Sequence, residues 1–312
     1  MSIYFEKLLL KAIAIIILAS QSPSIAQVSS IDGGKFNTKV NNSINGKCNR
    51  GSCKVSGGSL GGRRKRLLFH RLSKLNTKES RIKDIKVSIP RKKISTLILS
   101  ISDKEKAYLS KPLVLSKNVD LILISPGGIT IEQGAQFINT QSLALTSKPR
   151  LRVRGSNFDA TKTSAQELSN LTLQNYFNSE EFLVQSQAKT ILNNSGHTQD
   201  YKNIEIYGPL TISGKLFVGS EGHILVMNAD IKAKQGILLL NKKSFSYPGL
   251  SEAVGIQIEY SELESEEGEI YINGIAKPSV ISSNGVVINS SLLKSPIVSV
   301  LGKNKNDGEY QS

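Results

Sequence analysis

The sequence predicts an all-β protein, and three observations support this fold class. Short apolar runs, most of three to six residues and many of them β-branched, follow one another after residue 90 and are separated by turn residues. None of these runs extends into a long pattern of helical period, and only residues 164–177 could hold a helical turn or two. Leu121–Ile124 is apolar at every position, as expected of a strand that is buried on both faces.

The expected strands are the apolar runs themselves, taken in chain order. Those before residue 190 are Ile94–Ile101, Leu113–Leu115, Val119–Ile124, Ile129–Ile131, Leu143–Thr146, Leu151–Val153, Leu168–Leu173 and Phe182–Val184. Those after residue 200 are Ile204–Ile206, Leu210–Ile212, Leu216–Val218, Ile224–Met227, Ile237–Leu240, Ile256–Ile258, Ile270–Ile272 and Val286–Ile288.

Two β architectures remain open on this pattern alone. Residues 208–241 repeat strand, sharp turn and strand, as the stacked coils of a parallel β-helix do. Two Asn-Gly dipeptides near the C-terminus are typical of the tight hairpins in β-sandwiches, although most turns here are looser. The repeat is uneven, because the step from Ile204 to Ile224 is 20 residues and the following step, to Ile237, is 13. The pattern therefore favours a β-helix only slightly.

Ser125–Gly128 is expected to form a type II turn directly after the strand Leu121–Ile124. Pro126 has the fixed φ that the second residue of such a turn needs, and Gly127 can supply the positive φ of the third residue. Ile129–Ile131 then resumes a strand. The turn is thus an architectural element that contains no catalytic group.

Three segments together resemble a known family of exported proteins. Leu123–Ala135, which contains the turn, resembles the Asn-Pro-Asn-Gly-Ile turn of the filamentous-haemagglutinin-type secretion domain, found at the N-terminus of two-partner-secretion (TpsA-like) exoproteins. Val55–Ser59 and Leu67–Leu72 resemble the Gly-Gly-Thr segment and the Leu-Phe-His element of that domain, in the same order along the chain. The resemblance covers residues 45–185.

The chain departs from the family pattern at three of these positions. Ser125 and Gly127 stand where the family usually has asparagines, and Leu72 stands where an aromatic residue is common. Glycine and asparagine both tolerate positive φ, so Gly127 preserves the turn geometry. A serine can still accept a local backbone hydrogen bond. The departures therefore concern recognition more than fold.

The resemblance implies a right-handed parallel β-helix with an N-terminal cap and short extra-helical strands. It also implies a partner: a TpsB-type outer-membrane β-barrel transporter, whose periplasmic domains would recognise the chain while it is unfolded. The exported protein would be adhesin- or haemagglutinin-like. An alternative is that the two blocks serve the fold only. The competing function is a surface module that binds glycans or other polyanions by itself, and a β-helical polysaccharide-degrading enzyme is a less favoured one. The candidate recognition residues are Leu68, Phe69, His70, Ser125, Pro126, Gly127, Gly128 and Ile129.

The N-terminus has the three parts of a secretory signal peptide. Lys7 and Lys11 give a positive n-region, Ala12–Ala19 is an apolar h-region, and Ser24–Ala26 is a small-x-small cleavage site. The h-region is too short to cross a bilayer as a helix. We expect cleavage after Ala26 and a mature protein that does not span a membrane and is secreted or held at the surface of a Gram-negative-type bacterium.

Composition along the chain divides it into four parts. Residues 1–26 are the expected signal peptide, and residues 27–93 are polar, glycine-rich and basic, as expected of an N-terminal cap with early strands. Residues 94–301 are the expected β-helix, with the secretion domain itself over residues 45–250. Residues 302–312 are polar and expected to be frayed.

Cys48 and Cys53 are the only cysteines, and in an oxidising compartment we expect them to form a disulfide. Zinc binding is the alternative, but it needs more ligands nearby than His70, His197 and His223 offer. The sequence therefore predicts neither a metal nor a cofactor.

The basic residues are concentrated in one segment. Residues 61–93 contain thirteen Lys and Arg against Glu79 and Asp84, a local excess of eleven within a net charge of +15. Such a segment suits a polyanion such as an acidic glycan, or else is a solvated surface. Nucleic acid is disfavoured, because few aromatic residues are interspersed among the cations and the chain is expected to be exported. Residues 259–269 are acidic and are expected to be a solvated insertion.

The sequence predicts no enzyme. Parallel β-helices include polysaccharide lyases and hydrolases, whose sites need clustered carboxylates or a metal with a basic proton acceptor. The aspartates here are scattered singly. His70 could be a base, but it has no evident partner and is expected to pack or hydrogen-bond within Leu67–Leu72. The separate aspartates are Asp103, Asp120, Asp159 and Asp230.

Overall fold

The all-β prediction is confirmed: the part of the chain that the structure describes contains strands and no helix. The computed structural model describes residues 26–30, 36–62, 65–78, 81–90, 93–102, 106–147, 150–153, 156–159, 203–220, 222–241, 245–246, 252–276 and 282–304. Residues 1–25 of the expected signal peptide, the possible helical turn at 164–177 and the expected strands Leu168–Leu173 and Phe182–Val184 lie outside these ranges.

The strands of the N-terminal half are β1 (Gln27–Ser29), β2 (Thr38–Val40), β3 (Lys47–Cys48), β4 (Arg50–Gly57), β5 (Ser59–Gly61), β6 (Leu67–Leu72), β7 (Lys74–Asn76), β8 (Arg81–Val87), β9 (Thr96–Ile101), β10 (Ala107–Leu109), β11 (Leu113–Ile124), β12 (Ile129–Ile131), β13 (Phe137–Thr146), β14 (Arg150–Val153) and β15 (Ser156–Asp159). Those of the C-terminal half are β16 (Ile204–Tyr207), β17 (Leu210–Ile212), β18 (Lys215–Ser220), β19 (Ile224–Met227), β20 (Asp230–Ala233), β21 (Gly236–Asn241), β22 (Phe245–Ser246), β23 (Glu252–Glu259), β24 (Glu262–Ser265), β25 (Ile270–Ala276), β26 (Ser282–Asn289), β27 (Leu292–Lys294) and β28 (Val298–Asn304).

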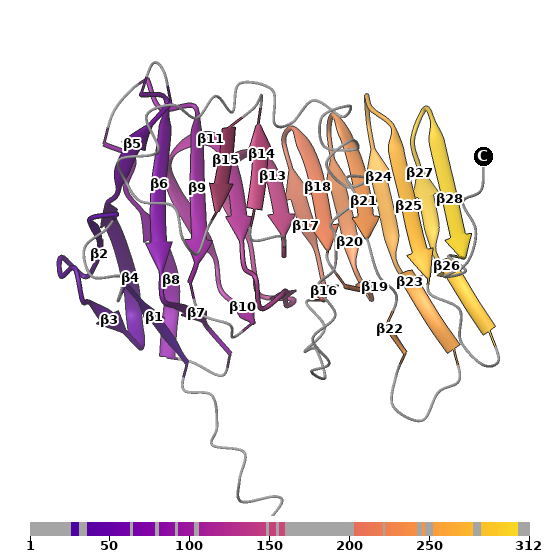
Figure 1. Cartoon of the computed structure of the whole chain (residues 1–312), viewed down its shortest axis with the longest axis horizontal. Coiled ribbons are helices and arrows are strands. Elements are labelled where there is room, and N and C mark those ends of the chain that lie inside the picture. The colour runs from indigo at the N-terminus through magenta and orange to yellow at the C-terminus, as the bar shows by residue number, and fades with distance from the viewer. Residues whose placement is uncertain are drawn as a thin grey trace, which may run out of the picture.

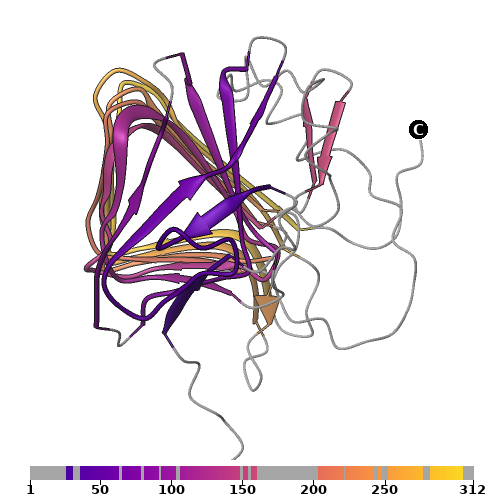
Figure 2. The same ribbon diagram turned by 90° about the vertical axis from the view of Figure 1, so that its left-hand side faces the viewer.

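The strands stack along one axis in long parallel sheets (Figure 1). The first sheet contains β10, β12, β16, β19, β23 and β26 in that order, and the second contains β17, β20, β24 and β27. The third contains β9, β11, β13, β18, β21, β25 and β28. Seen along the stack, the sheets enclose a three-sided body (Figure 2). From β16 onward, each coil contributes one strand to each side. This arrangement is consistent with a β-helix-like fold.

The true repeat differs from the one that the sequence indicates. In the first sheet Ile204 pairs with Ile224, Ile224 with Ile256, and Ile256 with Val286, so the steps are 20, 32 and 30 residues. Ile237 belongs to the third sheet. The predicted step from Ile224 to Ile237 was therefore wrong, because it compared two different sides of one coil.

The core lies inside the stack and is built from columns of like residues. One column of the third sheet is buried throughout and consists of Leu97, Leu121, Leu143, Leu216, Ile237 and Ile270. Leu121–Ile124 is buried at all four positions, which confirms that this strand is covered on both faces. Aligned apolar side chains of this kind remove large areas from water and stabilise stacked parallel strands.

Antiparallel strands close the N-terminal end of the stack. β1 pairs antiparallel with β3 and β7, β2 with β4, and β5 with β6. β4 and β6 also pair parallel with β8 and β9, so coils begin within the segment expected to contain the cap. Pairing of this kind covers an edge that would otherwise template aggregation. Cys48 and Cys53 form a disulfide between β3 and β4.

Two further segments bear on the sequence analysis. β14 and β15 pair only with each other and stand outside the three sides of the body (Figure 2). The acidic segment is not an insertion: it forms β24 and the following corner, within a regular coil. It takes that place because lysines of the flanking coils pair with it, as in Lys232–Glu264 at 3.4 Å and Lys294–Glu262 at 2.6 Å.

Candidate functional site

The Leu-Phe-His element forms the middle of β6, where every residue is buried. Leu68 and Phe69 pair in register with Leu97 and Ile98 of β9, and His70 pairs with Leu99. Because side chains alternate along a strand, Leu68 and His70 point into the core and Phe69 points outward. The exposed fractions of Leu68, Phe69 and His70 are 0%, 1% and 0%. None of the three can contact a partner of the folded protein.

The outer side of β6 is covered by residues that precede it in the chain. The guanidinium of Arg71 lies over the Phe36 ring, 4.1 Å from its centroid. The backbone N–H of Arg71 donates a hydrogen bond to Thr38 Oγ1 at 3.0 Å. β5 pairs antiparallel with β6 along its free edge. The N-terminal cap therefore covers the Leu-Phe-His element as well as the end of the stack.

His70 is a neutral core residue in the folded chain. Neither Nδ1 nor Nε2 has a hydrogen-bond partner, and burial lowers the pKa of the imidazole to about 4. Gly58 lies against the imidazole ring: a Cβ added at Gly58 would be only 2.8 Å from His70 Cε1, so no larger residue fits there. The ring is fully buried, so solvent does not reach it in the folded chain. Of the two expected structural roles, the structure places it in packing rather than hydrogen bonding.

The turn Ser125–Gly128 lies at the corner between the third and first sheets. The Gly128 N–H donates a hydrogen bond to the Ser125 carbonyl at 2.9 Å, which closes the turn. Gly127 does not have a positive φ, whereas Gly128 has a φ of 103°. The type II prediction was therefore wrong. Serine first, proline second and glycine fourth are the preferences of a type I turn, and a hydrogen-bonded turn without a positive φ at its third residue agrees with that type.

Gly128 is the position in this turn that requires glycine. An added Cβ would lie 2.6 Å from the Asn203 carbonyl oxygen of the next coil, in addition to the strain of a positive φ. Ser125 is fully buried, and its Oγ accepts a hydrogen bond from the Ala107 N–H at 3.3 Å. Pro126 and Ile129 are buried as well, and only Gly127 is partly exposed. The turn thus links three coils.

The two blocks lie close to each other in the folded chain. Arg71 pairs with Ser100, and Ser100 pairs with Ile124, the residue before the turn. Two strand spacings separate the end of the Leu-Phe-His element from the turn, or about 10 Å. The structure therefore brings the two predicted recognition blocks to strands that are separated only by β9, but places almost all of their side chains inside the protein.

The described aspartates are not brought together. Asp120 lies on β11, where burial raises the pKa of its carboxyl to about 6 and hydrogen bonds from Ser142 oppose the shift. Asp230 lies on β20 in a different sheet and is exposed. Asp159 ends β15, and Asp103 lies outside the described residues. Within the described ranges, no group of three or more His, Cys, Asp or Glu side chains could hold a metal ion.

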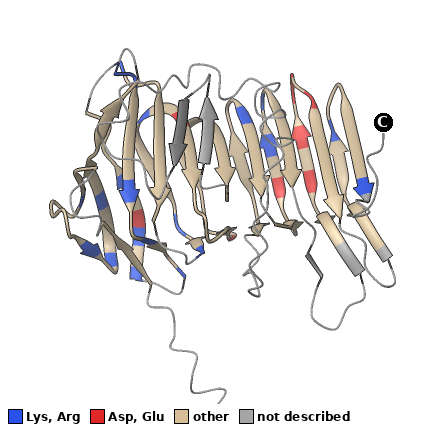
Figure 3. Ribbon diagram, in the orientation of Figure 1, with Lys and Arg blue, Asp and Glu red and all other residues tan. Residues whose placement is uncertain are grey.

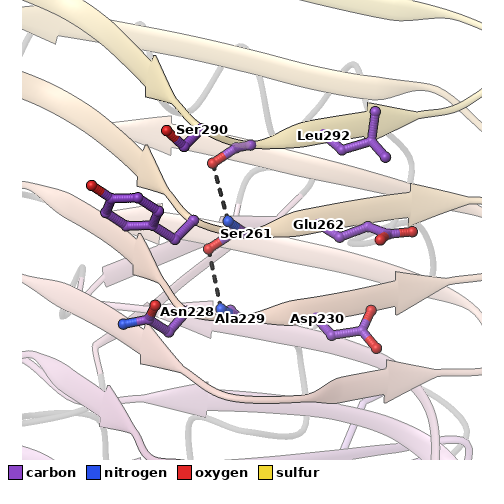
Figure 4. Close-up of a pocket in the computed structure, with 9 residues that line it drawn as sticks. Asn228, Ala229, Asp230, Ser261, Glu262, Ser290 and Leu292 are labelled. Atoms are coloured by element: carbon purple, nitrogen blue, oxygen red, sulfur yellow. Dashed lines mark hydrogen bonds between the residues drawn. The ribbon is translucent and has the colours of Figure 1, made fainter.

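A shallow groove that the sequence analysis missed follows one corner of the C-terminal coils (Figure 4). Its floor is a serine ladder: the Ala229 N–H donates to Ser261 Oγ, and the Ser261 N–H donates to Ser291 Oγ, both at 3.1 Å. Asn228, Tyr260 and Ser290 precede these residues and all have positive φ. In the sequence, the only indication of this groove is that the three positive-φ residues recur at steps of 32 and 30 residues. The unequal lengths of the coils make this recurrence hard to detect. The serine ladder thus connects three successive corners by hydrogen bonds.

No protein-family model matches the sequence, and no curated protein is significantly similar to it. The described part of the chain contains no helix that is long and apolar enough to cross a membrane.

Proposed function

We propose that this chain is an exported, non-enzymatic exoprotein of the two-partner-secretion type, folded as a right-handed parallel β-helix. Its partner would be a TpsB-type outer-membrane transporter, and its destination the cell surface or the medium. The support is the sequence resemblance together with one structural observation: all the residues of the two recognition blocks except Gly127 are buried once the chain has folded.

Because these residues are buried in the folded chain, a partner can bind them only before they fold. Exposing Phe69 would cost roughly 2–3 kcal/mol for the side chain alone, and it would also require β6 to leave β9. A transporter domain that depends on Leu68, Phe69 or His70 must therefore bind before β6 pairs. An extended β6 could add a strand to a sheet of the transporter by β-augmentation. Recognition and folding are thus mutually exclusive states of the same segment.

Folding outside the cell then gives export a direction. Each completed coil offers a strand edge and an apolar column on which the next coil can pair, as in other solenoids. The columns through Leu121 and Ile129 continue from coil to coil without a break in register. A chain that has added coils on the outer side cannot slide back without losing that buried surface.

The test compares export of variants in the recognition block with export of variants at equally buried positions on the neighbouring strand. Phe69→Leu and His70→Leu replace buried side chains by apolar ones of similar or smaller size in strand β6. Ile98→Leu and Leu99→Ile are matched controls, because these residues are their register partners on β9 and are equally buried. Each variant is expressed with a two-partner transporter, and the protein in the medium is quantified against the cell-associated protein.

We expect export of the β6 variants to fall severalfold, while the β9 controls are exported as wild type. Urea unfolding of each purified variant shows whether the folded state has been preserved. Equal export of the β6 variants and their controls, at equal stability, would contradict the recognition role. Wild-type export that does not depend on the transporter would contradict the proposed function as a whole.

A further inference from the structure

Many Lys and Arg residues lie on the strands near the N-terminal end of the stack (Figure 3). β2, β4 and β8 are neighbours in one sheet, and their outer face carries positively charged side chains without interruption by aromatic residues. We refer to these residues as the basic ladder. They are Lys39, Arg50, Lys54, Arg81, Lys83 and Lys86.

The register places like charges directly opposite each other. Arg50 pairs with Arg81, and Lys54 pairs with Lys86. Lys83 is the extra residue where the register shifts, so it adds a cation between the two pairs. Like charges directly opposite each other destabilise a sheet. The two like-charge pairs therefore lower the stability of the sheet, so stability does not explain their presence.

The ladder has almost no internal counter-charge. Among the described residues the one carboxylate within salt-bridge distance of these six side chains is Asp84, whose Oδ2 lies 3.7 Å from Lys86 Nζ. Arg50, Lys54, Arg81, Lys83 and Lys86 are exposed, and Lys39 is partly exposed. On the second sheet, by contrast, the lysines Lys232 and Lys294 form ion pairs with Glu264 and Glu262. The cations of the ladder are therefore available to an external anion.

The backbone under the ladder is held in place. The Cys48–Cys53 disulfide brackets Arg50, and the Lys54 N–H donates a hydrogen bond to Asn41 Oδ1 at 3.0 Å. Neighbouring strands lie about 4.8 Å apart, and the four-residue step from Arg50 to Lys54 spans about 13 Å. The face is thus a rigid grid of cation pairs, which lowers the entropic cost of binding a multiply charged ligand.

We infer that the basic ladder is a binding site for a linear acidic polysaccharide, bearing sulfate or carboxylate groups. The row through Lys54 and Lys86 continues in register to Val114 and Ile138, the latter 40% exposed, so the carbon skeleton of a sugar chain finds an apolar strip beside the cations. Nucleic acid is less suited, because β2, β4 and β8 offer no aromatic side chain for stacking bases. This inference does not rest on the export proposal.

The position of the ladder differs from the basic segment that the sequence indicates. Arg81, Lys83 and Lys86 belong to that segment, but Lys39, Arg50 and Lys54 precede it. Arg71, also within the segment, is buried on β6 against Phe36. The described cations of the segment 61–93 therefore do not form one patch, since strand register determines which of them share a face.

The test measures binding of the mature chain to fluorescent heparin and to polygalacturonate at two salt concentrations. Lys54→Gln/Lys86→Gln and Arg50→Gln/Arg81→Gln each remove one cation pair. Lys232→Gln/Lys303→Gln is the matched control, because it removes the same charge from exposed lysines of the C-terminal coils. Melting temperatures verify folding, and the ladder variants should melt no lower than wild type because a like-charge contact has been removed.

We expect each ladder variant to bind heparin or polygalacturonate roughly tenfold more weakly, about 0.7 kcal/mol per cation. The slope of log Kd against log salt should flatten by about two for these variants. The control should bind within twofold of wild type. An equal loss in the control would show that net charge alone attracts the glycan and would overturn the site. Unchanged binding in the ladder variants would do the same, and tighter binding of duplex DNA or of phosphatidylglycerol vesicles would overturn the ligand class.

Discussion

Acid should destabilise the folded chain through His70, and replacing this histidine by leucine should remove that loss. Burial lowers the pKa of the folded imidazole to about 4, whereas in the unfolded chain it titrates near its ordinary value of 6.5. Above pH 6.5 the imidazole is neutral in both states and its contribution is constant. Between pH 6.5 and pH 4 the unfolded chain binds a proton that the folded chain does not, so the free energy of unfolding falls with pH.

The magnitude follows from the difference between the two pKa values. That difference is about 2.5 pH units, and each unit corresponds to about 1.4 kcal/mol, so the complete loss is about 3 kcal/mol and the loss at pH 5 about 2 kcal/mol. His70→Leu cannot bind a proton and fits the same column, since its register partner is Leu99. The variant also removes two buried nitrogens without hydrogen bonds, so at pH 7.5 it should be at least as stable as wild type.

The assay is urea unfolding of wild type and His70→Leu at pH 7.5 and pH 5.0. Other titrating groups, including His223, are common to both proteins, so they cancel in the comparison. We expect the wild type to lose about 2 kcal/mol more than the variant between the two pH values. Equal losses would show that His70 is accessible to protons in the folded state, and would refute its placement in the core.

Three further sets of variants test other parts of the fold. Gly128→Ala should lower the free energy of unfolding by about 2–4 kcal/mol, and Gly127→Ala should lower it by less than about 1 kcal/mol. The reason is that, of the two, only Gly128 has a positive φ and faces the Asn203 carbonyl. Similar urea midpoints for the two variants would contradict the type I turn. Cys48→Ala/Cys53→Ala should cost about 2 kcal/mol, the loop-closure entropy of so short a disulfide loop, and reductant should then have no further effect on unfolding; a variant as stable as the oxidised wild type would count against the bond. Ser261→Ala should cost about 1–2 kcal/mol by leaving the Ala229 N–H without its acceptor, whereas Ser290→Ala, at an exposed position of the next corner, should be nearly neutral.

The features that local sequence dictates were predictable. The strand Leu121–Ile124 is apolar at every position, and such a run is stable only when it is covered on both faces, as observed. The all-β class follows from many short runs of this kind. These inferences succeed because neighbouring residues alone determine them.

The features that depend on contacts between coils were not predictable. Both Gly127 and Gly128 tolerate a positive φ, and the choice between them involves the Asn203 carbonyl, 75 residues further along the chain. The repeat was misjudged because corners of unequal length shift the register, so that Ile237 took the place that belongs to Ile256. The proximity of the two recognition blocks was likewise not predictable, because it depends on the pairing of β6 and β11 with β9.

The basic ladder is a third example of a feature that strand register determines. Arg50 and Arg81 are 31 residues apart and become direct neighbours only when β4 and β8 pair. From the sequence, the basic surface was assigned to residues 61–93 by counting cations in a window. Such a count does not show which side chains point outward. Side-chain direction is decided by alternation along each strand, and the extra residue at Lys83 changes that alternation.

The central claim is that the transporter reads residues which folding conceals. Its most direct test measures binding of the transporter's isolated periplasmic domains to the native chain and to the chain within seconds of dilution from urea. We predict binding to the freshly diluted chain that decays as β6 becomes buried, and no binding to the native chain. Equally tight binding to the native chain would contradict the claim, because Leu68, Phe69 and His70 are not accessible there.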